Sequence, residues 1–180
     1  MTSIDDLAAI EPADEIQPDD LADDPREDIE ALCLCALLWA PADAAARIAA
    51  VLEPSDFYRP IYAELYTVIA DLVRTGVPHG TAMVAAKLEQ DGRLGGHTGQ
   101  RLAKALTDVT LAGADGIAAG HYAHAVIRRA YRRGFHDAAQ SLAQAAATLP
   151  EDQLFEHMVT LGTERRAATR RLAAIQQNPL

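Results

Sequence analysis

The feature that most constrains this chain is a pair of long apolar periodicities that meet at one proline. From about residue 115 to residue 149, apolar side chains recur every three or four positions, and no proline interrupts them before Pro150. After Pro150 the same spacing continues to about residue 175. Such spacing is typical of amphipathic helices. The sequence therefore predicts two long helices that fold back as an antiparallel hairpin over residues 115–176.

A projecting hairpin leaves one apolar face that has to be covered. One interpretation is a coiled coil that packs only on itself or on the rest of the chain. The other is an oligomerisation element, because an uncovered apolar face on a small domain is a binding surface. Under the second interpretation the predicted oligomer interface consists of Tyr131, Phe135, Leu142, Leu154, Met158 and Leu161. Gly134 lies inside the first helix and should weaken it by about 1 kcal/mol relative to alanine.

Residues 25–114 carry shorter helical patterns, with helix starts expected at Asp24-Pro25, Pro41, Ser55 or Asp56, Thr81 and Thr98. Gly76 and Gly92 are expected to close two of these helices. No alternating run rich in β-branched residues occurs between turn signals. The predicted fold is all-α, a small orthogonal helical bundle over 25–114 followed by the hairpin. The expected helices are 25–39, 41–52, 55–76, 81–89 and 98–109.

The acidity of the chain is concentrated at its start. The formal net charge is −10, yet residues 1–30 hold twelve acids and one base, a balance of −11. The first 24 residues contain two prolines, Pro12 and Pro18, and no aromatic residue, so they cannot bury enough surface to offset the entropy of ordering. Residues 1–24 are therefore predicted to be a disordered acidic tail. It is either a solubilising leader, a docking motif, or a strand that covers an arginine surface elsewhere in the chain.

Several classes of function lack their sequence patterns. No apolar run of 18 residues and no basic-then-apolar N-terminus occurs, so we expect a cytoplasmic chain with no membrane contact. No phosphate-binding loop, nucleophile elbow or H-E-x-x-H segment is present, which predicts neither an enzyme nor a cofactor site. Cys33 and Cys35 are expected to be buried thiols. His121 and His124 share a helix face without an acid at ligand spacing, so surface histidines are expected rather than a metal site.

Arginines are the most informative polar residues of the hairpin. Residues 120–180 hold eight arginines and no lysine, which favours bidentate contacts with carboxylates or phosphates. The spacing of four of them places the guanidinium groups on one side of the first helix, opposite its apolar stripe. The alternatives are a solvated face, an acidic protein partner, or the backbone of a nucleic acid contacted without sequence specificity. The predicted partner-binding residues are Arg128, Arg129, Arg132, Arg133, Arg165 and Arg166.

The segments 30–38, 52–60, 61–76 and 88–94 resemble the N-terminal domain of the bacterial replicative helicase of the DnaB type. The most specific part is a D-F-Y-x-P element formed by Asp56, Phe57, Tyr58 and Pro60. The segment 120–129 is similar to the start of that family's hairpin, and the resemblance covers about residues 28–172. It implies hairpins that pair two subunits, dimers that assemble into a ring-shaped collar, and a role in recruiting primase or a loader.

The chain departs from the family pattern in three places. His79-Gly80-Thr81 replaces the usual aspartate-led helix start, and Cys33 and Cys35 occupy a glycine-rich position. The chain also stops where the ATPase domain would begin, which suggests a collar without a motor. The leading hypothesis is a non-enzymatic oligomerisation and recruitment module of DNA replication, a homodimer or higher oligomer with primase, helicase or loader as candidate partners. The alternative is a nucleic-acid-associated regulator that binds phosphates through its arginine helices and is autoinhibited by the acidic tail.

Overall fold

The computed structural model describes residue 24 and residues 26–177, and this described part is helical with no strand. The predicted all-α fold is confirmed. The predictions made from the sequence for residues 1–23 lie outside the described residues. The elements are α1 (Ile29–Trp39), α2 (Ala42–Ala49), η3 (Pro54–Asp56), α3 (Pro60–Arg74), α4 (Thr81–Gln90), α5 (Gly96–Thr110), η4 (Gly116–Ala118), α6 (Ala119–Thr148) and α7 (Glu151–Gln177).

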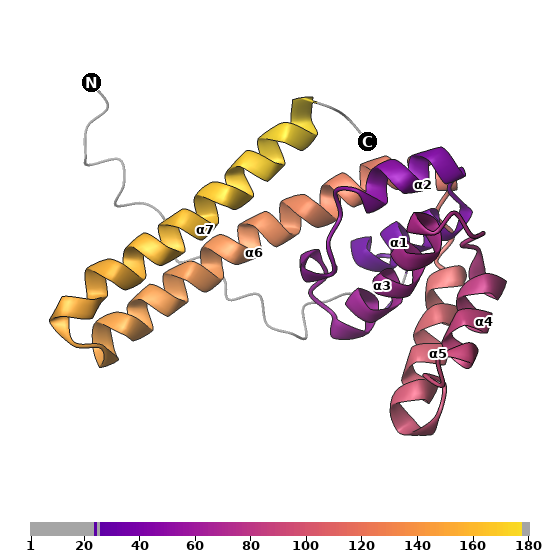
Figure 1. Ribbon diagram of the computed structural model, residues 1–180, viewed down its shortest axis with the longest axis horizontal. Helices are drawn as coiled ribbons and strands as arrows, with labels where there is room; N and C mark the ends of the chain where they lie inside the picture. Colours follow the sequence, from indigo (N-terminus) through magenta and orange to yellow (C-terminus); the bar gives the residue numbers. More distant parts are fainter. Residues whose placement is uncertain (1–23, 25, 178–180) are drawn as a thin grey trace.

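Helices α1–α5 gather at one end of the molecule, and α6 and α7 form an antiparallel hairpin that projects from them (Figure 1). The turn between α6 and α7 lies at Leu149-Pro150, as the sequence predicts. The first turns of α6 are part of the bundle core, where Ala123, Val126 and Ile127 are buried. The projecting part of the hairpin therefore begins after Ile127.

Helix α1 is the centre of the bundle. Eight of its eleven residues are buried, so it is apolar on nearly all sides, as expected of a helix enclosed by others. It packs against α3, α5, α6 and η4. Cys33 and Cys35 are buried and free, as predicted, and burial raises the pKa of the Cys33 thiol. Gly116 sits directly against the Trp39 carbonyl, where any Cβ would overlap it, so glycine allows η4 to close over the end of α1.

Two helix starts differ from the sequence prediction because the expected aspartate does not cap the helix. Helix α1 begins at Ile29, where the Asp28 carboxylate accepts from the backbone N–H of Glu30 at 2.9 Å. The predicted cap, Asp24, instead closes a separate turn before the helix. Helix α3 begins at Pro60 without a side-chain cap. The predicted cap Asp56 is used in another contact, described below.

Glycines mark the other boundaries. Helices α4 and α5 start after Gly80 and Gly95, so Thr81 and Thr98 are not the caps that the sequence predicts. The Thr81 hydroxyl lies 3.1 Å from the hydroxyl of Thr110 instead. The predicted closing residues are confirmed, since Gly76 and Gly92 adopt φ of 70° and 67°.

Two further boundaries of the predicted helices shift. Helix α2 ends at Ala49 rather than Leu52. Helix α6 begins at Ala119 because the Asp115 carboxylate caps the short η4 turn. None of the helices in the described ranges has the length and apolar character needed to cross a bilayer.

Candidate interaction surface on the helical hairpin

The hairpin is fixed to the bundle by one carboxylate. Asp56 ends η3 and is buried, and its carboxylate accepts from the backbone N–H of Glu53 at 2.8 Å. The Arg171 guanidinium of α7 binds both oxygens of the same carboxylate and also donates to the Val51 carbonyl at 2.6 Å. The hydrogen bond to Asp56 is the main reason that the pKa of Arg171 is raised. A bidentate pair of this kind combines charge with fixed orientation.

A second arginine binds the same loop from α6. Arg133 donates to the carbonyl oxygens of Ser55 and Asp56, at 3.3 Å and 3.0 Å. Its guanidinium also lies over the Tyr58 ring, 5.4 Å from the centroid. We call the three side chains Asp56, Arg133 and Arg171 the hairpin root. The root joins each of the two hairpin helices to the loop that follows α2.

The loop that receives the root is itself held by α1. The buried Glu30 carboxylate accepts from the backbone N–H groups of Tyr58 and Arg59, at 2.7 Å and 3.2 Å. Burial raises the pKa of Glu30 more than these hydrogen bonds lower it. Phe57 packs on Tyr66 with ring centroids 5.1 Å apart. The D-F-Y-x-P element is therefore a structural junction. Its side chains and backbone amides hold either the hairpin or the loop that supports the hairpin.

Beyond the root the two hairpin helices share little buried surface. Among the described residues past Ile127, only Ala145 and Ile175 are buried apolar residues, and Ile175 belongs to the bundle core. Polar contacts cross between the helices instead, from Tyr131 to Thr169 at 3.1 Å and from Ser141 to His157 at 3.0 Å. The hairpin is a rod with a thin interior, and several of its other apolar side chains are exposed.

The Arg165 side chain of α7 crosses α6 at Gly134, the one glycine of α6 in the projecting part of the hairpin. A Cβ on Gly134 would overlap the Arg165 guanidinium, so the glycine leaves room for that side chain to lie on the helix backbone. The Nε of Arg165 is buried without a hydrogen-bond partner. Glu164 is its ion-pair partner, with the nitrogen and oxygen 3.9 Å apart. Gly134 is expected from the sequence to weaken the helix, and its packing against Arg165 explains why a glycine is present there.

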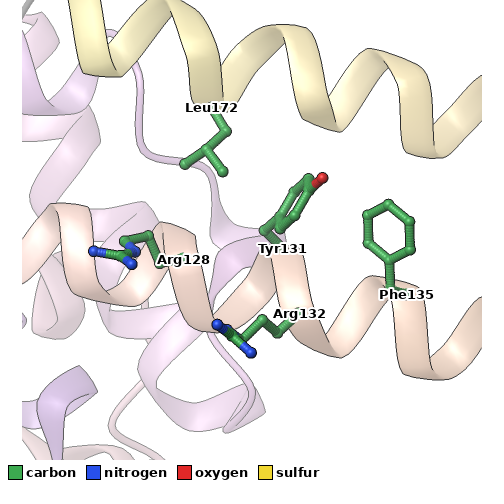
Figure 2. Close-up of a pocket in the computed structure, with 5 residues that line it drawn as sticks. All are labelled: Arg128, Tyr131, Arg132, Phe135 and Leu172. Atoms are coloured by element: carbon green, nitrogen blue, oxygen red, sulfur yellow. The ribbon is translucent and has the colours of Figure 1, made fainter. Parts of the chain in front are cut away.

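An open pocket lies between the hairpin helices next to the bundle, and Figure 2 shows its lining. Leu172 of α7 faces Tyr131 of α6, and the Tyr131 and Phe135 rings lie 4.9 Å apart. Arg128 and Arg132 flank these apolar side chains. We call this set the arginine pocket, and its residues are Arg128, Tyr131, Arg132, Phe135 and Leu172.

The predicted oligomer interface is partly open to solvent. Phe135 and Met158 are each 45% exposed, and Leu142 is also exposed. Tyr131, Leu154 and Leu161 are half-buried. Sequence reasoning missed Phe155 and Val159, which are 70% and 48% exposed on α7. Phe155 lies three positions before Met158 and four before Val159, so it is a neighbour of both on the helix surface. The apolar periodicity of α7 could have revealed this pattern.

The arginines do not form the single free face that their spacing predicts. Arg133 turns toward the bundle as part of the hairpin root, and Arg165 lies over Gly134. Arg128 and Arg132 line the arginine pocket beside the apolar stripe rather than opposite it. Arg129 and Arg166 are exposed. Arg171, the arginine that binds the buried carboxylate, was not among the predicted site residues, because its partner is 115 positions away.

The histidines of α6 do not form a metal-binding cluster with other described residues. His121 is exposed and His124 is half-buried, with its Nε2 buried and unpartnered. No group of three His, Cys, Asp or Glu side chains among the described residues has the arrangement that a metal ion requires.

Two comparisons with known proteins bear on this arrangement. The family described as DnaB-like helicase N terminal domain matches residues 23–128, more than half of the chain. A solved structure, the N-terminal domain of DnaB helicase from Mycobacterium tuberculosis, is similar with a TM-score of 0.63 and 26% sequence identity. That similarity covers 77% of this chain and 95% of the other. The residues that match the family include the D-F-Y-x-P element, its supporting helix α1 and the first turns of α6.

Proposed function

Because the chain belongs to the DnaB-like helicase N-terminal domain family, we propose that it is a non-enzymatic oligomerisation and recruitment module of DNA replication. The domain that matches is the non-catalytic part of that helicase. Self-association uses the hairpin, and recruitment uses the arginines that stay exposed beside it. Primase, a helicase loader and a full-length helicase are the partners that we propose.

The observation that carries this proposal is the exposed apolar surface of a hairpin that has little interior of its own. Phe135, Leu142 and Met158 are exposed, and the half-buried Tyr131, Leu154 and Leu161 lie beside them. Burial of side chains of this size contributes roughly 1.5 to 3 kcal/mol each. A second copy that covers several of them at once would gain enough free energy to form a stable dimer.

Light scattering on the full chain tests the self-association. We expect Phe135→Asp combined with Met158→Asp to convert the oligomer into a monomer, because two charges would be placed in the buried interface. Met83→Asp is the matched control, since Met83 is similarly exposed but lies on α4, away from the hairpin (Figure 1). An unchanged mass in the double variant, or a monomeric parent chain, would remove the hairpin as the interface.

Recruitment is tested with purified proteins of the source organism. Primase, loader and full-length helicase are immobilised in turn, and binding of the full chain is measured. We expect the combination Arg128→Glu, Arg129→Glu and Arg166→Glu to weaken binding to the true partner, because exposed arginines set partner choice through charge. Equal binding of parent and variant to all three proteins would contradict the recruitment part of the proposal.

The phosphate-binding alternative is not favoured by the geometry. Arg133 and Arg171 donate to groups within the chain, and Arg165 is packed over Gly134. These three guanidinium groups are therefore committed to the fold rather than presented as a row to a nucleic-acid backbone.

A further inference from the structure

We propose that residues 1–23 of the same chain bind in the arginine pocket and cover it. This inference concerns a different contact from self-association, although it involves two of the same residues, Tyr131 and Phe135.

The pocket has the chemistry to receive a short acidic segment with an aliphatic side chain. Its apolar part consists of Tyr131, Phe135 and Leu172, and its polar part is two guanidinium groups one helical turn apart (Figure 2). Neither Arg128 nor Arg132 forms an ion pair with any residue of the described ranges. A matching ligand would place carboxylates on the two arginines and an aliphatic side chain on the apolar part.

The first 23 residues have that composition. They contain eight acids and no base, whereas residues 120–180 have a balance of +3. The triplet Asp-Asp-Leu occurs twice, at 5–7 and at 19–21, and each copy places two carboxylates directly before a leucine. The acids are Asp5, Asp6, Glu11, Asp14, Glu15, Asp19, Asp20 and Asp23.

The start of α1 also lies near the hairpin root. Asp28, four residues after Asp24, forms an ion pair with Arg59, 3.4 Å apart. The neighbouring Glu30 holds Tyr58, whose ring lies under Arg133, the residue next to Arg132. The start of α1 and the hairpin root are therefore at the same side of the bundle.

Residues 1–23 are long enough to reach the arginine pocket. A segment of 23 residues spans at most about 75 Å when extended, while the 30 residues of α6 span about 45 Å. Covalent linkage at such lengths gives an effective concentration in the millimolar range. Weak individual contacts thus suffice, and the Asp5-Asp6-Leu7 copy can reach the pocket from anywhere near α1.

Paramagnetic broadening in the full chain tests the contact. A nitroxide is attached to Ser3→Cys, which can be labelled selectively because Cys33 and Cys35 are 0% and 1% exposed. We expect the amide signals of residues 128–135 on α6 and of Leu172 on α7 to lose intensity. The loss should disappear at about 1 M salt, where the screening length is about 3 Å.

Paired variants identify the pocket. Arg128→Gln with Arg132→Gln should restore the signals, and so should the exchange of Asp5, Asp6, Asp19 and Asp20 for asparagine. Arg166→Gln with Arg170→Gln removes two exposed arginines from α7 and should leave the broadening unchanged. Absence of broadening in the parent chain, or broadening that survives the Arg128 and Arg132 exchanges, overturns the proposal.

A mixture separates this contact from contact between copies. Spin-labelled chain without ¹⁵N is added to ¹⁵N-labelled chain without the spin label. Broadening of residues 128–135 in this mixture to the same extent as in the fully spin-labelled chain would mean that the segment binds a neighbouring copy, and the proposal would fail. If the proposed self-association also holds, the asparagine variant should self-associate more tightly in light scattering, because the segment no longer competes for Tyr131 and Phe135. The two readouts are independent, so either proposal can fail alone.

Discussion

The bundle and the hairpin differ in how many apolar side chains they bury. In the bundle, α1 is enclosed on nearly all sides and large side chains such as Leu34, Leu65 and Tyr66 are fully buried. In the projecting hairpin, Ala145 is the one buried apolar residue among those described, since Ile175 belongs to the bundle core. The bundle therefore supplies its own stability, whereas the hairpin depends on its root and on whatever covers its exposed face. Regions that bury little are the ones available for partners.

The largest expected effect compares one leucine from each region. Leu34→Ala removes a fully buried side chain from α1 and should lower the free energy of unfolding by about 2 to 5 kcal/mol. Leu154→Ala on α7, where the leucine is half-buried, should cost less than about 1.5 kcal/mol at low protein concentration. Urea unfolding followed by circular dichroism measures both. Equal losses at both sites would show that the hairpin has a core of its own.

Protein concentration sharpens this comparison. If a second copy covers the hairpin, the cost of Leu154→Ala should grow as the concentration is raised, because the partner contact contributes to stability by mass action. A cost that is the same at all concentrations would indicate that Leu154 packs only within its own chain.

The next effect is at the hairpin root. Arg171→Leu leaves the buried Asp56 carboxylate without its cation, and breaking a buried pair costs about 3 to 5 kcal/mol. The Arg171 side chain is 28% exposed, so we expect about 1 to 3 kcal/mol here. Hydrogen exchange should quicken most at the α7 amides near Arg171.

Two further variants define this effect. Arg166→Leu on the same helix is the control and should be near neutral, since Arg166 is exposed. Asp56→Asn together with Arg171→Leu should be less destabilising than Arg171→Leu alone, because no unpaired charge remains. A double variant that is worse than both single variants would contradict the ion-pair account of the root.

A smaller effect is the pH dependence that Glu30 contributes. Burial raises the pKa of Glu30 above its ordinary 4.5, so the folded chain keeps this proton to higher pH than the unfolded chain does. The contribution of Glu30 to stability is therefore largest below about pH 4.5 and declines as the pH rises through its folded pKa.

Unfolding titrations from pH 4.5 upward compare the parent with Glu30→Gln, which cannot titrate. We expect the stability of the parent relative to the variant to decline toward neutral pH, by about 1.4 kcal/mol for each unit of pKa shift. Glu89→Gln, at an exposed position on α4, should show no such trend. A difference that grows with pH would mean that the two backbone hydrogen bonds outweigh burial.

Whether a feature could be predicted from the sequence depends on how far apart along the chain the interacting residues lie. The hairpin was predictable because its spacing and Pro150 act locally along the chain. The caps were not, because Asp24 and Asp28 compete for one helix start and Asp56 is taken by a distant arginine. The root was not predictable either, since Arg171 and Asp56 are 115 positions apart and nothing near Arg171 indicates its partner. The D-F-Y-x-P element was found as a pattern, but its purpose as a support for the hairpin required the fold.

The smallest expected effect is at Gly134. It tests whether helix propensity or the packing of Arg165 determines how a substitution at this position changes stability. Alanine at Gly134 should favour the helix by about 1 kcal/mol, but its Cβ would displace the Arg165 guanidinium that now lies there. We expect Gly134→Ala to be nearly neutral in the parent chain, because these effects oppose each other. In a chain that already carries Arg165→Ala, the same exchange should stabilise by the full helical preference. Thermal unfolding of the four chains of this cycle gives the coupling between the two sites. A coupling of zero would mean that Arg165 leaves the helix at no cost, and the contact would then contribute nothing to holding the two hairpin helices together.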